Sequence, residues 1–290
     1  MNEEKTSFMD QLFTEPVYSD SPQTEALFLK ALQEELIFHY EHNDMYRQFC
    51  NRKGFDPHAE LNDIKQIPPV AVSVFKNLGY GLASVPKEDI KLRLQSSATS
   101  GTPSTVVVDK ITSKRQAKAM VKVMQEFIGK DRKPFLVMDI DPRSEFRSLL
   151  GARFAAITGY LNFASKSGFF LKAKNGVSYF DIDAIKEYLT TIPSDQPVVV
   201  FGFTYIMYSN VLKAILAKGE KIQLPKGSKI IHIGGWKKLE AEKVEKSLFN
   251  QQLADGFGIE PTDVIDIYGF TEQMGLNYPD CPCGCKHTSA

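Results

Sequence analysis

The sequence predicts an α/β fold, with a mainly parallel sheet flanked by helices and an N-terminal helical segment. From residue 130 onward, short apolar runs typical of buried strands alternate with helical segments. This alternation indicates parallel strands, because a parallel connection has to cross over the sheet. Three of the predicted strands end in turns that combine glycine with aromatic or hydroxyl side chains, and the carboxyl edge of such a sheet is where ligands bind.

The composition is that of an ordinary globular protein. Of the 290 residues, 43% are hydrophobic and 24% are charged, so the chain can bury a large core. Lys and Arg together number 35, as do Asp and Glu, and this balance argues against a broad nucleic-acid-binding surface. No run approaches the roughly 18 apolar residues of a membrane span, and the polar N-terminus lacks a secretory signal. We therefore expect a cytoplasmic protein.

Local signals place the elements along the chain. Ser21 and Pro22 fit an N-cap and a first helical position, and Gly129 fits a helix end. Asn175-Gly176 is a strong hairpin signal. Pro68-Pro69 interrupts the loop-rich stretch 51–88. The predicted helices are 22–40, 113–128, 146–157, 203–216 and 240–253, together with a short helix that is capped by Asp181 or Asp183 and ends at Leu189. The predicted strands are 90–94, 106–108, 135–138, 169–171, 177–180, 197–201, 230–233 and 264–267.

A hydroxyl-rich loop, residues 96–105, lies between the strands predicted at 90–94 and 106–108. It reads SSATSGTPST, with one glycine and no charge. Backbone N–H groups in such a loop can cradle phosphate oxygens. The alternative is a polar hairpin turn. The loop is not a Walker phosphate loop, because it contains no lysine and precedes a strand instead of a helix.

Three successive strand ends share a pattern. They are Phe201-Gly202-Phe203-Thr204, Ile233-Gly234-Gly235-Trp236 and the stretch from Ile267 to Glu272. One such turn is weak evidence, since glycine is common after strands. Three of them at the carboxyl edge of a parallel sheet indicate a single cleft.

These residues resemble the adenylate-forming superfamily of acyl-CoA synthetases. The resemblance rests on Thr99-Ser100-Gly101-Thr102-Pro103 followed far downstream by Tyr268-Gly269-Phe270-Thr271-Glu272. Within the superfamily, the chain is most similar to LuxE-type acyl-protein synthetases and to phenylacetate–CoA ligase-like enzymes. Ile67–Val70 and Ser73–Lys76 resemble the LuxE entry segment.

The resemblance implies a fold, an activity and a set of roles. The chain would be the N-terminal large domain of an enzyme that joins a carboxylate to AMP and passes the acyl group to a thiol of a protein or of CoA. ATP and Mg²⁺ would be its cofactors, and the acid would be a fatty or an aryl one. Thr271 and Glu272 would be catalytic, with Thr271 on a phosphate oxygen and Glu272 on Mg²⁺. The implied nucleotide-binding residues are Ser97, Thr99, Ser100, Gly101, Thr102, Thr105, Gly234, Gly235, Trp236, Tyr268 and Gly269. The implied acyl pocket is Phe201, Gly202, Phe203, Thr204 and Tyr205.

Two departures from the family pattern keep other hypotheses open. The loop lacks the Thr-Gly pair expected after Thr102, and the chain ends soon after Glu272. We expect one large domain over 1–290, with an entry segment 1–88, a phosphate-loop lobe 89–195 and an adenine lobe 196–290, and no small C-terminal domain. The alternatives to a LuxE-type ligase are an aryl-CoA ligase-like enzyme, a binding relative or half-site with little turnover, and an unrelated parallel-sheet protein.

The remaining residues that could belong to a site are four in the C-terminal tail, together with Cys50 and His232. Cys281, Cys283, Cys285 and His287 form a set of ligand types that Zn²⁺ accepts. The alternative is an unstructured terminus with reactive thiols. We expect Cys50 to be structural, and His232, inside a predicted strand, to be a buried residue with its hydrogen bonds satisfied.

Overall fold

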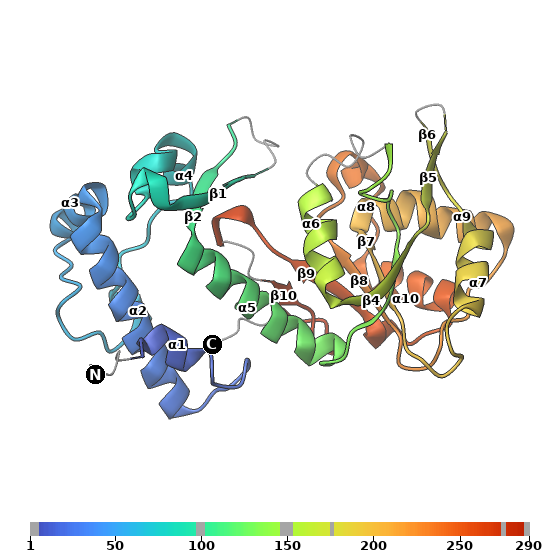
Figure 1. Ribbon diagram of the computed structural model, residues 1–290, viewed down its shortest axis with the longest axis horizontal. Coiled ribbons are helices and arrows are strands. Elements are labelled where there is room, and N and C mark those ends of the chain that lie inside the picture. The colour runs from blue at the N-terminus through green and yellow to red at the C-terminus, as the bar shows by residue number, and fades with distance from the viewer. Residues whose placement is uncertain (1–5, 97–101, 146–152, 175–176, 274–276, 287–290) are drawn as a thin grey trace. The chain divides into compact units, whose positions relative to one another are not determined.

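A computed structural model describes residues 6–96, 102–145, 153–174, 177–273 and 277–286. The chain divides into two compact units (Figure 1). Unit 1 comprises Met1–Met124, Phe270–Leu276 and Thr288–Ala290, and unit 2 comprises Gln125–Gly269 and Asn277–His287. None of the helices in these described ranges is long and apolar enough to span a bilayer.

Unit 1 combines helices with one antiparallel strand pair, β1 (Ile90–Gln95) and β2 (Thr105–Asp109). As predicted, Ser21 caps helix α2 by accepting a hydrogen bond from the Thr24 N–H at 3.1 Å. Helix α5 is tied to this unit by Lys122, whose ammonium donates to the Phe13 carbonyl at 2.8 Å. The helices and helical turns that begin in this unit or return to it are α1 (Phe8–Leu12), α2 (Pro22–His42), α3 (Asp44–Lys53), η1 (Ile64–Gln66), α4 (Ser73–Asn77), η2 (Gly79–Leu82), η3 (Lys87–Asp89), α5 (Lys110–Ile128) and η9 (Thr271–Gln273).

Unit 2 is built on a six-stranded sheet with the order β10-β9-β8-β7-β3-β4. All neighbours run parallel except β10 against β9, which confirms the predicted α/β class. The strands are β3 (Lys133–Val137), β4 (Ala164–Phe169), β7 (Val199–Phe203), β8 (Lys229–Ile233), β9 (Val264–Tyr268) and β10 (Tyr278–Pro279). A separate antiparallel pair, β5 (Leu171–Lys174) with β6 (Val177–Phe180), confirms the predicted hairpin, and the residues predicted for its turn, Asn175-Gly176, lie outside the described ranges.

Helices flank this sheet (Figure 1). They are α6 (Arg153–Tyr160), η5 (Leu161–Phe163), α7 (Ile182–Thr190), α8 (Thr204–Ile206), η6 (Met207–Leu212), α9 (Lys213–Lys218), η7 (Lys237–Glu242), α10 (Lys246–Phe257) and η8 (Pro261–Asp263). Alternating strand residues face opposite sides of the sheet. Val200 of β7 packs in one core with Phe249 of α10, whereas the ring of its neighbour Phe201 stacks on Tyr160 of α6 at 4.4 Å between centroids. Helices α6 and α10 therefore cover opposite faces.

Two predicted helices differ from those observed. Helix α5 begins at Lys110, three residues before the predicted start. The helix predicted at 240–253 is wrong at its start, because the chain forms the short η7 and then α10 from Lys246. Leu239 and Val244 both pack against the core of unit 2. They are five positions apart, and an unbroken helix would turn them to different faces.

Candidate functional site

In unit 2, the turns predicted after three strands lie together at the carboxyl edge of the sheet. Parallel pairing aligns Phe203 of β7 with Ile233 of β8, and Ile233 with Ile267 of β9. The residues that follow, Thr204, Gly234 and Tyr268, therefore emerge at the same edge of the sheet. The sequence prediction that these strand ends lie together is confirmed.

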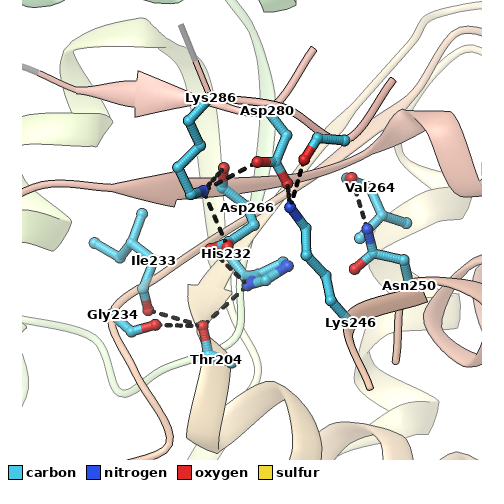
Figure 2. A network of polar contacts seen from close by, with 11 residues as sticks. Thr204, His232, Ile233, Gly234, Lys246, Asn250, Val264, Asp266, Asp280 and Lys286 are labelled. Carbon is cyan, nitrogen blue, oxygen red and sulfur yellow. Dashed lines mark hydrogen bonds and ion pairs between the residues drawn. The ribbon is translucent and has the colours of Figure 1, made fainter. Parts of the chain in front are cut away.

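A hydrogen-bonded chain lies under this edge (Figure 2). The Thr204 Oγ1 is 2.7 Å from the Gly234 carbonyl oxygen and 2.9 Å from the His232 Nδ1. His232 is buried, and desolvation lowers its pKa, although the nearby carboxylate of Asp266, 3.6 Å from the Nδ1, opposes that effect. The other ring nitrogen, Nε2, makes no hydrogen bond with the described residues, so the prediction that His232 is fully satisfied holds only for Nδ1.

The Gly234–Gly235 turn presents backbone to an open space. Gly234 has a φ of +77°, a conformation that a residue with a Cβ rarely adopts. At Gly235 an added Cβ would meet no described atom within 4 Å. Trp236 is different, because its ring is buried edge-to-face against Tyr208 at 4.9 Å and Phe249 at 5.6 Å between centroids. Trp236 thus anchors the turn in the core, while the two glycines form its accessible face.

Tyr268 lies at the end of the neighbouring strand, β9, with a side chain that is 53% exposed. Its ring centroid is 6.3 Å from that of Tyr278 on β10. The register of β8 and β9 brings Tyr268 and Gly269 beside the Gly234–Gly235 turn. An exposed aromatic ring next to open glycine backbone is a surface on which a flat heterocycle can stack.

The predicted acyl-pocket residues lie mostly in the core. Phe201, Phe203 and Thr204 are buried, and the rings of the two phenylalanines meet edge-to-face at 6.0 Å between centroids. At Gly202, an added Cβ would fall 2.6 Å from the Met207 sulfur. Only Tyr205 of this set is partly exposed. Their role as an acyl pocket stays a prediction.

A buried ion pair beside Tyr205 had no signal in the sequence. The Arg153 guanidinium donates from Nε to the Asp139 Oδ2 at 2.7 Å, from Nη2 to the Asp139 Oδ1 at 3.1 Å, and from Nη1 to the Tyr205 hydroxyl at 2.6 Å. Asp139 is fully buried, and burial raises the pKa of the Tyr205 phenol. The Asp139 carboxylate also accepts a hydrogen bond from the Ile140 N–H at 2.8 Å. The first residues of the helix predicted over 146–157, residues 146–152, lie outside the described ranges.

This ion pair occupies a distinctive place in the topology. The chain passes from β3 to β4 on one side, then returns to the other side of β3 to continue with β7, β8 and β9. The strand order therefore reverses between β3 and β7, and open α/β sheets bind ligands at the carboxyl ends beside such a reversal. Asp139 follows β3 and Tyr205 follows β7, so the pair lies at that point.

Unit 1 holds the residues predicted to bind the phosphates and Mg²⁺. Of the hydroxyl-rich loop, Ser97, Thr99, Ser100 and Gly101 lie outside the described ranges. At the two ends of this loop, the Ser96 N–H donates to the Ser104 carbonyl at 3.1 Å. Beside this contact, Thr105 pairs with Gln95 in the antiparallel ladder of β1 and β2. Thr102 is exposed. These positions confirm that the loop connects two antiparallel strands.

Thr271 and Glu272 form the short η9, which packs against β2. Both side chains are half-buried. The fold of unit 1 therefore brings the predicted catalytic pair beside the strand that follows the hydroxyl-rich loop, although 165 positions separate Thr271 from Val106 in the sequence. One carboxylate and one hydroxyl suit Mg²⁺, which completes its shell with waters and phosphate oxygens.

The cysteine-rich tail forms a closed loop. The Cys281 N–H donates to the Cys285 carbonyl at 2.8 Å, and Lys286 fixes the end of the loop through Asp266 and Asp280, each at 3.0 Å. Cys283 and Cys285 are exposed. Within the described ranges no three potential metal-ligating side chains gather, and His287 lies outside them. These residues therefore give the predicted Zn²⁺ site no support. Cys50 is buried, and desolvation raises its pKa, consistent with a structural thiol.

Known proteins resemble the chain in sequence and in fold. The chain is 26% identical over 244 residues to the long-chain-fatty-acid–luciferin-component ligase of Vibrio harveyi, covering 81% of this chain and 60% of that protein. It is 25% identical over 243 residues to the ligase of the same name from Aliivibrio fischeri, with the same two shares. The chain thus spans less than two thirds of these relatives.

Among solved structures, the fold resembles 2-hydroxyisobutyryl-CoA ligase in complex with 2-HIB-AMP in the postadenylation state. The TM-score is 0.62 at 13% identity, over 92% of this chain and 53% of that one. For the thioesterification state with 2-HIB-AMP and CoA, the TM-score is 0.61 at 14% identity, over 93% and 54%. The sequence profile described as "Acyl-protein synthetase, LuxE" matches residues 2–290. The chain therefore belongs to the LuxE acyl-protein synthetase family.

Proposed function

We propose that the chain activates a long-chain fatty acid as its acyl-adenylate, with ATP and Mg²⁺, for transfer to a thiol. The observation that carries the proposal is the Gly234–Gly235 turn with its open face beside the exposed ring of Tyr268. Membership of the LuxE family and the names of the two curated relatives support a long-chain fatty acid as the substrate. The acceptor thiol belongs to a protein or to CoA.

The chemistry suits residues that position reactants. A carboxylate is already a nucleophile, so adenylation requires no strong protein base. The protein has to hold the carboxylate in line with the α-phosphate and to balance the charge that develops there. In this proposal Gly234, Gly235 and Tyr268 receive the adenine ring. Glu272 holds Mg²⁺ and Thr271 binds a phosphate oxygen, and Mg²⁺ supplies charge neutralisation of the phosphates.

The test is ATP–pyrophosphate exchange with a panel of fatty and aryl acids. We expect exchange that depends on a long-chain fatty acid and on Mg²⁺. Exchange with aryl acids alone would replace the proposal by an aryl-CoA ligase-like activity. Absence of exchange with every acid, while calorimetry detects ATP binding, would make the chain a nucleotide-binding relative without turnover.

A substitution in the turn tests the adenine site separately. Gly235→Val should fold normally, because the space beside Gly235 is open, and should weaken ATP binding by filling that space. Gly235→Ala is the smaller control and should have the smaller effect. Unchanged ATP affinity in Gly235→Val would contradict this location for adenine.

A further inference from the structure

The geometry around the Thr204 hydroxyl shows which groups donate in the hydrogen bonds beneath the Gly234–Gly235 turn (Figure 2). The Thr204 hydroxyl oxygen is 2.7 Å from the Gly234 carbonyl and 3.3 Å from the Ile233 carbonyl. Carbonyl oxygens only accept, so the single hydroxyl proton of Thr204 points toward them. The His232 Nδ1, at 2.9 Å from the same hydroxyl oxygen, is then the donor. His232 is thus the tautomer with its proton on Nδ1.

The carboxylates near His232 are themselves paired with lysines. Asp266 faces the Nδ1 at 3.6 Å, and its carboxylate is paired with the Lys286 ammonium at 3.0 Å. Lys286 also binds Asp280 at 3.0 Å, and Asp280 binds Lys246 at 2.5 Å. Two lysines thus face two aspartates. The ring is 2% exposed and packs edge-to-face on Phe249, at 5.3 Å between centroids.

The hydrogen-bonded chain ends on the Gly234 carbonyl, in the turn with the open face. Gly234 has a left-handed φ of +77°, and the peptide that follows it leads directly to Gly235. A glycine pair has the greatest backbone freedom in the unfolded chain, so its shape has to be fixed by its surroundings. Thr204 binds two successive carbonyls of this turn, Ile233 and Gly234.

We infer that Thr204 and His232 are positioning residues that hold the Gly234–Gly235 turn in the conformation that receives the adenine ring. The inference rests on the nucleotide-binding role proposed above. Neither residue is required to touch ATP. Thr204 fixes the Gly234 carbonyl, and His232 fixes the direction of the Thr204 hydroxyl proton.

Matched substitutions separate this role from simple packing. Thr204→Val keeps the shape and removes the hydroxyl, whereas Thr204→Ser keeps the hydroxyl. His232→Asn keeps an N–H donor at the position of Nδ1, whereas His232→Gln moves the donor outward to the position of Nε2. We expect Thr204→Val and His232→Gln to weaken ATP binding by about tenfold, and Thr204→Ser and His232→Asn to stay closer to the unmodified chain.

The fluorescence of a tryptophan next to the glycine turn can report ATP binding. Trp236 is the single tryptophan of the sequence and follows Gly235 directly. Its fluorescence should change on titration with ATP, and its emission without ATP should differ in Thr204→Val. Acid-dependent pyrophosphate exchange gives the second measurement. We expect the KM for ATP to rise in His232→Gln while the KM for the fatty acid stays unchanged, a split that general loss of packing would not produce.

The outcomes distinguish the two proposals. If the unmodified chain binds ATP and folded Thr204→Val binds it equally well, the positioning role is overturned and the proposed function stands. If the unmodified chain does not bind ATP, the proposed function fails and the positioning role fails with it. If Thr204→Val does not fold, His232→Asn and His232→Gln decide, because equal ATP affinities in these two variants overturn the inference.

Discussion

At the scale of single residues, the most costly group to bury is the Asp139 carboxylate. It is fully buried and depends on Arg153, whose side chain is 16% exposed. Breaking a buried pair by removing one partner leaves a charge without solvent or counter-ion. The pair holds the hydroxyl of Tyr205 at the point where the strand order reverses, so its geometry also fixes one side of the candidate site.

We expect Arg153→Met to lower the free energy of unfolding by about 3–5 kcal/mol, because the buried Asp139 carboxylate would lose the guanidinium that pairs with it. Urea denaturation measures this loss. Arg143→Met is the control, because Arg143 pairs with Asp141 at 2.9 Å but is 74% exposed, and it should cost no more than about 0.5 kcal/mol. A double variant, Asp139→Leu with Arg153→Met, should recover part of the stability. Equal losses in the two arginine variants would contradict this account.

Glu272 carries the prediction about Mg²⁺. Glu272→Gln keeps the size of the side chain and removes the charge that the proposal assigns to metal binding. We expect Mg²⁺-dependent pyrophosphate exchange to fall by about a hundredfold with the fold intact. Glu240→Gln, an exposed acid on η7, serves as the control. Exchange retained at the level of that control would remove Glu272 from the site.

At the scale of elements, the junction between β7 and its helix depends on a close approach. The helical segment continues from α8 into η6, a π-helical turn that starts at Met207. The Met207 sulfur fills the space where a Cβ of Gly202 would lie, at 2.6 Å. Glycine is therefore required inside this strand by packing. Segments of π-helix are frequent at functional sites, and this one follows directly on Thr204 to Ile206.

Two glycine-to-alanine substitutions compare a glycine that is enclosed by core packing with a glycine that borders open space. Gly202→Ala should lower the free energy of unfolding by about 1–3 kcal/mol, because the new methyl group collides with Met207. Gly235→Ala should leave stability within about 0.5 kcal/mol, since nothing lies within 4 Å of its added Cβ. Chemical denaturation of both variants measures the difference. A stable Gly202→Ala variant would show that Met207 can repack.

At the scale of the whole molecule, two histidines, the buried His232 and the partly desolvated His39, couple folding to pH. Desolvation lowers the pKa of His232 in unit 2, and desolvation also lowers that of His39 in unit 1, where Glu35 opposes the effect. In the unfolded chain both return to a value near 6.5. Below that pH the unfolded chain binds protons that the folded protein does not bind, so acid favours unfolding.

The free energy of unfolding should therefore change little between about pH 7.5 and 8 and fall as the pH drops from about 7.5 to about 5.5. His232→Asn removes one of the two groups, so its stability should fall less over the same range. Urea denaturation at several pH values gives both curves. Identical pH dependence in the variant and the unmodified chain would contradict the low pKa of His232.

The pattern of residues along the chain is enough to predict the fold class and the candidate edge. Apolar runs alternating with helices predicted the parallel sheet, and the glycine-containing strand ends predicted that Thr204, Gly234 and Tyr268 lie together. Such patterns are local, and parallel topology converts them into position, because all the carboxyl ends meet at one edge.

Which side chains face ligand space and which support it depends on how the strands and helices pack together. Asp139, Arg153 and Tyr205 come from three segments and carry no shared motif, so their pairing depends on the order of the strands. Trp236 and Phe201 have the residue types of a binding site, yet they are buried because alternate positions of a strand and its following turn must fill the two faces of the sheet. His232 likewise gains its tautomer from Thr204, a contact between neighbouring strand ends that are 28 positions apart in sequence.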